Sequence, residues 1–450
     1  MLQDYLHESK KKPTVSGHIR NIVASGIHSS SSRLFASNIT KASLALVLNL
    51  ILTQVLGAAQ FGLLSLMLSI LLTTSAITDF GLAISYVSLH VRKSETGENV
   101  QQYTKAIFSL RIGLSAACAC LALLVMPYIF SHLGAGNLPL GFLILASFFL
   151  FFDSLFNFVL AMLQAEKAFK EYGSANALVN IVRMVGIVVV SICFILNIEI
   201  TIGVYVGSLI IVLAYILKIR PQYRWDLSAL VTKGSFSKLL RWSRWTFLQT
   251  IANVFFVKLD ILMLGAFHVS HELIGNYSLA FVFAGILTLF QVTANTLLLP
   301  KVNSFRSFTQ IEQYIKNMFK VVVVAGPLIV LGGVVITVFL HWIYSSSYPA
   351  AWSIFIILYT GFAFSLFATP FVMLAYSIER PDIPAFQNMV GLVMVFCLNL
   401  FLVPTYGIWG TAIAFIVARA FTEIGAVAVI IRKIKINHLQ NPQAKLGTSY

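Results

Sequence analysis

Long apolar segments recur along the whole chain and are separated by short polar gaps. Each is long enough to cross the roughly 30 Å hydrocarbon core of a bilayer as an α-helix. Only helices or closed barrels satisfy every backbone group in lipid, and these continuous segments are too long for barrel strands. The pattern therefore predicts an all-α polytopic membrane protein with twelve transmembrane helices. The expected spans are 35–56, 62–90, 105–129, 138–163, 174–196, 201–217, 245–266, 274–300, 320–344, 351–376, 385–403 and 409–431.

Composition and charge agree with a membrane location. Hydrophobic residues make up 58% of the 450 residues and charged residues 10%, which is more apolar surface than a soluble fold could bury. The net charge of +15 reflects topology rather than nucleic acid binding. When a residue at the first position of a span is counted with the preceding gap, five of the 31 Lys and Arg residues lie inside the expected spans, and all the others fall in one alternate set of gaps. This asymmetry places both termini in the cytoplasm.

The longest internal gap, over 218–244, is basic and lies near the middle of the chain. It divides the protein into two six-helix bundles, 35–217 and 245–431. Residues 1–34 and 432–450 are expected to be cytoplasmic tails. The first tail lacks the apolar core and small-residue cleavage site of a signal peptide.

The two halves resemble each other in sequence. Phe61–Leu66 matches Ile274–Leu279 at an offset of 213 residues, and Tyr103–Phe108 matches Tyr314–Phe319 at an offset of 211. Six helices per half keep both copies in the same orientation, which predicts a parallel repeat about an axis along the membrane normal. Transport sites in such folds lie between the halves, near the middle of the membrane.

Charged side chains inside the spans need an explanation, because each costs a few kcal/mol or more at depth unless it is paired or faces water. Snorkelling of Lys41 or Arg111, and ion pairs within or between helices, remain open as structural explanations. The nine such residues are Lys41, Asp79, Arg111, Asp153, Arg183, Lys258, Asp260, Arg419 and Glu423.

Helical phase sorts some of these residues by face. Asn180 and Arg183 share one face of their span, and Asn253 and Asp260 share a face of another. Lys258 falls on the opposite side from Asp260. If the amide-bearing face lines a cavity, Asp260 faces that cavity and Lys258 does not.

A cavity supplied with guanidinium and amide groups suits a large polar anion, such as a sugar carried on a diphosphate. Arginine binds phosphate oxygens bidentately, and buried acids can serve as protonatable coupling sites. The candidate substrate-binding residues are Arg183, Arg111, Lys41, Arg419, Lys258, Asn180 and Asn253, and the candidate ion-coupling or gating residues are Asp260, Asp79, Asp153 and Glu423.

No nucleotide-binding, zinc-protease or redox motif occurs in the sequence, and the expected external loops are short. The sequence therefore predicts a protein that is not an enzyme and that uses no cofactor or metal. An exporter of small cationic drugs and a non-transporting scaffold of a polysaccharide assembly complex remain alternatives.

Four stretches carry a family resemblance that runs over roughly 33–435. Val55–Gly62, Asp79–Leu82, Lys258–Gly265 and Glu272–Tyr277 are similar to sequences of the O-antigen and repeat-unit flippases (the Wzx type). These flippases belong to the multidrug/oligosaccharidyl-lipid/polysaccharide exporter superfamily.

The resemblance implies two six-helix bundles around a central cavity. It also implies movement of undecaprenyl-diphosphate-linked oligosaccharide to the outer leaflet of a bacterial inner membrane. Membrane lipid, H⁺ or Na⁺, a polysaccharide polymerase and a chain-length regulator are the partners expected from it. Cationic cavity residues bind substrate in this family, which points to Arg183, Lys41, Arg111 and Arg419, followed by Lys258, and it gives Asp260 a coupling or gating role.

Overall fold

The structure is a computed structural model that describes residues 30–87, 90, 100–136, 138–193, 196–220, 233–305, 307–380 and 382–440. Nearly all of the expected N-terminal tail lies outside the described residues, as do most of the C-terminal tail and part of the linker. Every regular element in the described ranges is a helix. The prediction of an all-α polytopic membrane protein is confirmed.

Five helices form the N-terminal half of the described chain: α2 (Ser30–Thr78), α4 (Val100–His132), α5 (Leu140–Ala165), α6 (Phe169–Cys193) and α7 (Ile198–Ile219). The C-terminal half contains α8 (Lys233–Ala266), α9 (His271–Ala284), α10 (Ile286–Asn303), α11 (Phe308–Tyr344), α12 (Ala351–Val372), α13 (Leu374–Ser377) and α14 (Asp382–Gln440). Helix α8 begins well before the expected residue 245, because its basic first turns are helical although they are too polar to belong to an apolar span.

Two helices contain a break that lets the chain reverse without a loop. Gly57 within α2 has φ +71°, and Gly407 within α14 has φ +56°. Glycine adopts this left-handed conformation without the steric cost that a β-carbon brings. Each of the two helices therefore covers two of the expected spans.

The number of membrane passes agrees with the expected twelve. Nine helices within the described ranges are long and apolar enough to cross a membrane. The count reaches twelve when α2 and α14 are taken as two passes each and α8 is added. Two expected spans are divided further, at Gly285 between α9 and α10 and at Met373 between α12 and α13.

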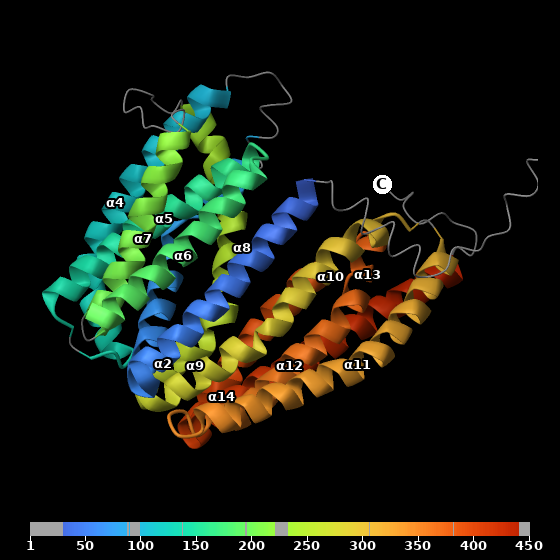
Figure 1. The fold of residues 1–450 in the computed structure, drawn as a ribbon. Coiled ribbons are helices and arrows are strands. Elements are labelled where there is room, and N and C mark those ends of the chain that lie inside the picture. Colours follow the sequence, from blue (N-terminus) through green and yellow to red (C-terminus); the bar gives the residue numbers. More distant parts are fainter. Residues whose placement is uncertain are drawn as a thin grey trace, which may run out of the picture.

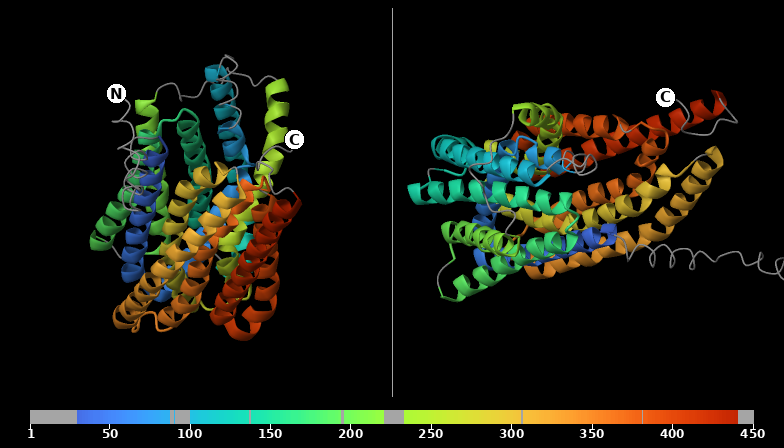
Figure 2. Two further views of the ribbon diagram at one scale, coloured as in Figure 1. Left: turned by 90° about the vertical axis from the view of Figure 1, so that its right-hand side faces the viewer. Right: turned by 90° about the horizontal axis from the view of Figure 1, so that it is seen from above.

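The two halves meet at one end and diverge at the other. In Figure 1 the helices of the N-terminal half stand at the left, and α10, α11, α12 and α14 run diagonally away from them toward the upper right. Figure 2 shows α14 folded back on itself as a hairpin beside α12. The described chain begins and ends on the side where the halves diverge, as expected for two termini on one face of the membrane.

Side-chain and backbone contacts join the halves at the end where they converge. The Tyr348 hydroxyl donates to the backbone carbonyl of Thr53 at 2.8 Å, and its ring packs edge-on against Phe61. The His271 ring nitrogen Nε2 lies 2.9 Å from the carbonyl oxygen of Gly134. These contacts close the molecule at this end.

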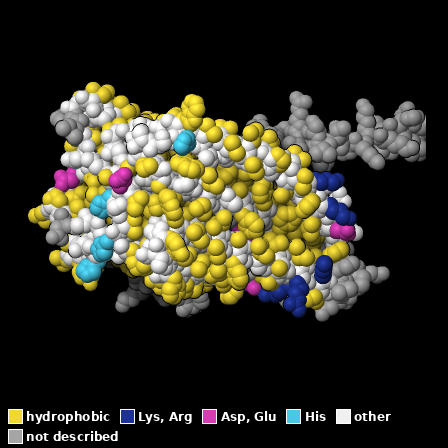
Figure 3. All heavy atoms as spheres, turned by 90° about the horizontal axis from the view of Figure 1, so that it is seen from below, with side chains coloured by type: hydrophobic (Ala, Val, Ile, Leu, Met, Phe, Trp, Pro, Cys, Tyr) yellow, Lys and Arg dark blue, Asp and Glu magenta, His cyan; other side chains and the backbone are white. Residues whose placement is uncertain are grey.

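Charge is separated along the molecule on the face drawn in Figure 3. Lys and Arg side chains gather at one end, His side chains gather toward the other, and a broad hydrophobic belt lies between them. A belt of this kind is expected where lipid tails surround the protein. Which end of the molecule faces the cytoplasm stays a prediction.

Candidate functional site

Arg111 and Asp79 form a buried ion pair between α4 and the end of α2. Arg111 Nη2 lies 2.9 Å from Asp79 Oδ1, and the arginine side chain is only 1% exposed. Its Nη1 donates to the backbone carbonyls of Thr78 at 3.1 Å and Asp79 at 3.0 Å. Arg111 thus stabilises the C-terminal end of α2. Most of the hydrogen-bond donors of Arg111 are used within the protein.

Asp153 of α5 is the centre of a second polar cluster in the N-terminal half. Ser75 donates to its Oδ2 at 2.6 Å and Asn157 donates to the same oxygen at 2.9 Å. The carboxylate also interacts electrostatically with Arg183 and Lys41, although neither lies within ion-pair distance among the described residues. Two cations, one from α2 and one from α6, therefore act on this buried acid without forming an ion pair with it.

Arg183 of α6 is half-buried and is held by two residues of α7. Its Nε donates to the Ser208 hydroxyl at 3.0 Å, and its Cζ lies 4.3 Å from the centre of the Tyr205 ring. Among the described residues neither Nη group has a hydrogen-bond or ion-pair partner. Asn180, one turn earlier, is 6% exposed and donates to the carbonyl of Asn176 at 2.9 Å.

In the C-terminal half, Asp260 of α8 accepts hydrogen bonds from two other helices. The Tyr277 hydroxyl donates to its Oδ2 at 2.7 Å, and Asn399 donates to its Oδ1 at 3.2 Å. Asp260 is 3% exposed. The carboxylate is thus enclosed by α9 and α14 of its own half.

Arg419 and Glu423 lie one turn apart in α14 and are loosely paired. Arg419 Nη1 is 4.0 Å from Glu423 Oε1, and the guanidinium stacks on Phe256 at 4.2 Å. Ser365 of α12 donates to the same glutamate oxygen at 3.0 Å. The intrahelical pair left open by the sequence therefore exists, although it is long.

A cavity of about 420 Å³ lies between the halves and brings several predicted site residues together. Helices α2, α4 and α5 supply its walls from the N-terminal half, and α8 supplies the wall from the C-terminal half. The Thr250 hydroxyl on α8 has no hydrogen-bond partner among the described residues. The charged and amide side chains that line the cavity are Asp79, Arg111, Asp153, Asn157 and Lys258.

The expected orientation of α8 is wrong. Lys258 lines the cavity, whereas Asp260 faces its own half. Helical phase correctly placed the two residues on opposite sides but could not tell which side met the other half. The side chain of Asn253, also expected in the cavity, lies outside the described residues.

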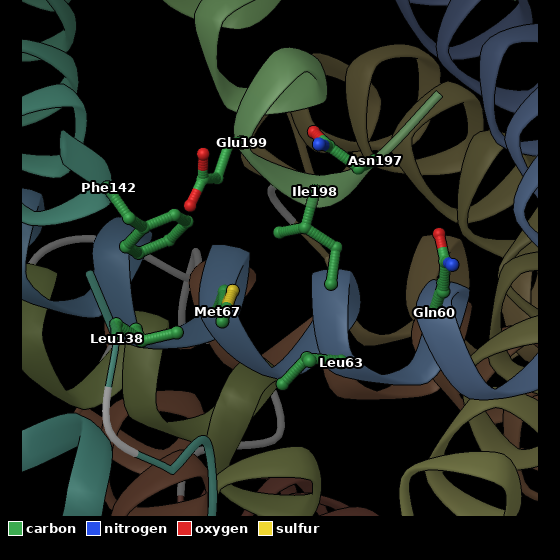
Figure 4. Close-up of a pocket in the computed structure, with 8 residues that line it drawn as sticks. All are labelled: Gln60, Leu63, Met67, Leu138, Phe142, Asn197, Ile198 and Glu199. Atoms are coloured by element: carbon green, nitrogen blue, oxygen red, sulfur yellow. The ribbon is translucent and has the colours of Figure 1, made fainter. Parts of the chain in front are cut away.

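A second hollow, of about 390 Å³, lies near the end where the halves converge. Figure 4 shows Phe142 and Glu199 beside it, with Gln60 of α2 farther along the same helix as Met67. Its walls are mainly apolar and contain none of the buried charges. It therefore does not extend the polar site.

Several site residues were missed from the sequence. Ser75, Asn157, Tyr205, Ser208 and Asn399 each hydrogen bond or stack with a buried ionisable group. All are polar or amphipathic residues within apolar spans, which is a detectable signal. Asn157 lies one turn from its partner Asp153 on α5, whereas the partners of the other four lie on other helices and could not be identified from spacing along one helix.

Comparison with solved structures defines the class of fold. The lipid II flippase MurJ, in an inward closed conformation, is 17% identical with a TM-score of 0.67, and the match covers 90% of each chain. An inward-facing multidrug resistance MATE family transporter of the MOP superfamily is 12% identical with a TM-score of 0.72, over 90% of this chain and 96% of that one. The fold is that of MOP-superfamily transporters.

Comparison of sequences then defines the family. Residues 28–305, more than half of the chain, match the profile of the polysaccharide biosynthesis protein family, and the chain belongs to that family. A probable flippase, AglR of Haloferax volcanii, is 22% identical over 212 residues, which cover 45% of this chain and 44% of that protein. The match thus spans less than half of the relative's length. The chain is thus a member of the polysaccharide biosynthesis protein family with the fold of MOP-superfamily transporters.

Proposed function

We propose that the chain is a flippase that moves undecaprenyl-diphosphate-linked oligosaccharide repeat units across the bacterial inner membrane by alternating access. The product would serve the synthesis of O-antigen or another surface polysaccharide. Membership of a polysaccharide biosynthesis family and the similarity to a probable flippase support this class of cargo. Orientation with both termini in the cytoplasm and division into bundles 35–217 and 245–431 are part of the proposal.

The observation that carries the proposal is a set of cations without carboxylate partners in the membrane-spanning region. Lys41, Arg183 and Lys258 have no ion-pair partner within 4.0 Å among the described residues, and Lys258 lines the cavity between the halves. An unpaired charge at this depth is costly unless it meets water or a ligand of opposite sign. An anionic cargo would provide that partner.

The arrangement suits a cargo with a diphosphate head and a lipid tail. Guanidinium and ammonium groups bind phosphate oxygens through charge-assisted hydrogen bonds, and amides such as Asn157 can bond sugar hydroxyls. The head group would enter where the halves diverge while the tail stays in the bilayer. Closure of that end and opening of the other would then expose the head group outside.

Buried acids are the proposed coupling sites for H⁺ or Na⁺. Asp260 contacts both α9 and α14, so a change in its charge would alter contacts between three helices at once. Asp79, Asp153 and Glu423 also lie beside cations and are the further candidates. A polysaccharide polymerase and a chain-length regulator are the expected protein partners.

A drug exporter is the alternative that the MATE-like fold favours. Fold alone does not decide between the two, because one fold serves different cargoes. Lys258 lines the cavity and would repel small cationic drugs. Vesicle assays of dye efflux and of lipid-linked sugar translocation would separate the two functions. A non-transporting scaffold of a polysaccharide assembly complex would show neither activity.

Deletion of the gene tests the proposal in cells. We expect undecaprenyl-diphosphate-linked oligosaccharide to accumulate, and mass analysis of the lipid extract would identify it. Complementation with Arg183→Ala should leave the accumulation in place although the protein reaches the membrane. Arg380→Ala, which removes an exposed arginine paired with Asp382, is the matched control and should restore export. An unchanged pool of lipid-linked sugars in the deletion strain would contradict the proposal.

A further inference from the structure

We infer that Tyr205 and Ser208 of α7 are positioning residues that aim Arg183 at the phosphate oxygens of the cargo. The inference rests on the proposed function and deepens it, since it assigns the diphosphate group to one guanidinium and explains how that guanidinium is held. Neither residue would touch the cargo. Both would act through Arg183.

The contacts of Arg183 leave one particular edge of the guanidinium free. A guanidinium has five N–H donors in one plane, one on Nε and four on the two Nη groups. The Nε donor is used by Ser208 at 3.0 Å, and the Tyr205 ring covers one face of the plane with its centre 4.3 Å from Cζ. No described residue accepts from the Nη groups, so the edge between them, with one N–H from each, is available to bind two oxygens of one phosphate.

Ser208 can only be an acceptor toward Arg183. Its hydroxyl hydrogen is donated to the carbonyl of Tyr205 at 2.7 Å, so its lone pairs are left to accept from the arginine Nε. Ser208 is 1% exposed and Tyr205 is 7% exposed. The side chains of Ser208 and Tyr205 are thus held in place by the packing around α7 before any cargo binds.

Arg111 lines the cavity between the halves and Arg183 is not among the residues that line it, yet the contacts of the two arginines favour Arg183 as the phosphate ligand. Arg111 has a carboxylate at 2.9 Å and donates to two backbone carbonyls, so it is satisfied by the protein. Arg183 has only a neutral hydroxyl and an aromatic ring in direct contact. Asp153, the acid that interacts with it electrostatically, forms no ion pair with it and already accepts from two side chains.

Holding the guanidinium in advance affects affinity. A free arginine side chain loses rotamer freedom when it binds a ligand, and this cost weakens binding. A stack on Tyr205 and a bond to Ser208 remove most of that freedom beforehand. Loss of either support should therefore weaken phosphate binding even though the charge of Arg183 is unchanged.

Binding of undecaprenyl diphosphate to the full chain in phosphatidylcholine nanodiscs tests the inference. We expect Arg183→Ala to raise Kd about tenfold or more, and Tyr205→Leu and Ser208→Ala to raise it about threefold to tenfold each. Tyr205→Phe keeps the ring and should bind like the wild type. In the Arg183→Ala background, Tyr205→Leu should have no further effect, because its role is exerted through the arginine.

The outcomes separate this inference from the proposed function. If the wild type binds no diphosphate lipid, the proposed function fails. If Arg183→Ala loses binding while Tyr205→Leu and Ser208→Ala keep wild-type affinity, the function stands and the positioning role is overturned. A further loss from Tyr205→Leu in the Arg183→Ala background would also overturn it, because Tyr205 would then act independently of the arginine. Should Tyr205→Leu fail to fold, Ser208→Ala still decides, because wild-type affinity in that variant would overturn the positioning role.

Discussion

Gly62 of α2 and Gly275 of α9 lie against each other's helix at the end where the two halves converge. A β-carbon on Gly62 would stand 2.6 Å from the backbone nitrogen of Gly275 and would collide with the carbonyl of His271. A β-carbon on Gly275 would collide with the carbonyl of Ala58. The two glycines occupy matching positions of the sequence repeat. Equivalent helices of the two halves therefore meet backbone to backbone.

Replacing either glycine should loosen this contact. We expect Gly275→Ala to destabilise the protein by about 1–3 kcal/mol, because the obstacle is backbone that cannot rotate away. Gly203→Ala is the matched control, since Gly203 lies in α7 with open space around its β-carbon position and should be neutral or slightly stabilising. Unfolding in detergent measures both. Equal stability of the two variants would show that the close approach does not matter.

The Asp79–Arg111 ion pair should behave as a structural element. Arg111→Gln or Asp79→Asn alone should cost about 3–5 kcal/mol, because each leaves one buried charge without its partner. The double variant should regain much of this loss, since no uncompensated charge remains. Unfolding of the three variants gives the coupling free energy. Additive losses in the double variant would mean that the two side chains do not act as a pair.

An exposed ion pair provides the control for that comparison. Lys316 and Glu312 lie one turn apart on α11 with a separation of 2.7 Å, and both are well exposed. Glu312→Ala should change stability by no more than about 0.5 kcal/mol, as is usual for such pairs.

Asp260 should control the response to an ion gradient. Its two oxygens accept from Tyr277 and Asn399, so Asp260→Asn removes the charge and places an amide N–H₂ where only acceptors are required. We expect this variant to lose the effect of an imposed H⁺ or Na⁺ gradient on transport. Affinity for the diphosphate lipid should stay within about twofold, because Asp260 does not line the cavity. Persistent gradient dependence would exclude Asp260 as the coupling residue.

Orientation can be tested with two cysteines near opposite ends of α11. Ser304 precedes the helix at the basic end, Ser346 follows it at the other, and both are exposed. In a chain without its four native cysteines, an impermeant thiol reagent added to intact cells should label Ser346→Cys and not Ser304→Cys. The reverse labelling would invert the predicted topology.

The sequence predicted the helical class and the number of passes because both follow directly from apolar segment length. It placed a span boundary near Gly57 and another near Gly407 but did not show that the chain reverses there at a single left-handed residue, since spacing does not reveal backbone conformation. The early start of α8 was missed for a related reason. Basic residues at Lys233 and Lys238 interrupt the apolar pattern without interrupting the helix.

The site was predicted less completely than the fold. Periodicity relates residues on one helix, and it correctly grouped Asn180 with Arg183 and separated Lys258 from Asp260. It cannot say which helix lies opposite each face, so the sequence left the cavity side of α8 conditional, and the structure places Lys258 rather than Asp260 on that side. The partner of Arg111 depends on the packing of α4 against α2 and was left open for the same reason.

Translocation of lipid-linked oligosaccharide by the purified protein in vesicles tests the central claim most directly. The same oligosaccharide should be presented on undecaprenyl diphosphate and on a neutral lipid of equal chain length. We predict that the wild type moves the diphosphate-linked cargo at least tenfold faster than the neutral one, and that Arg183→Ala abolishes this preference. Equal rates for the two cargoes, or no translocation of either, would contradict the account.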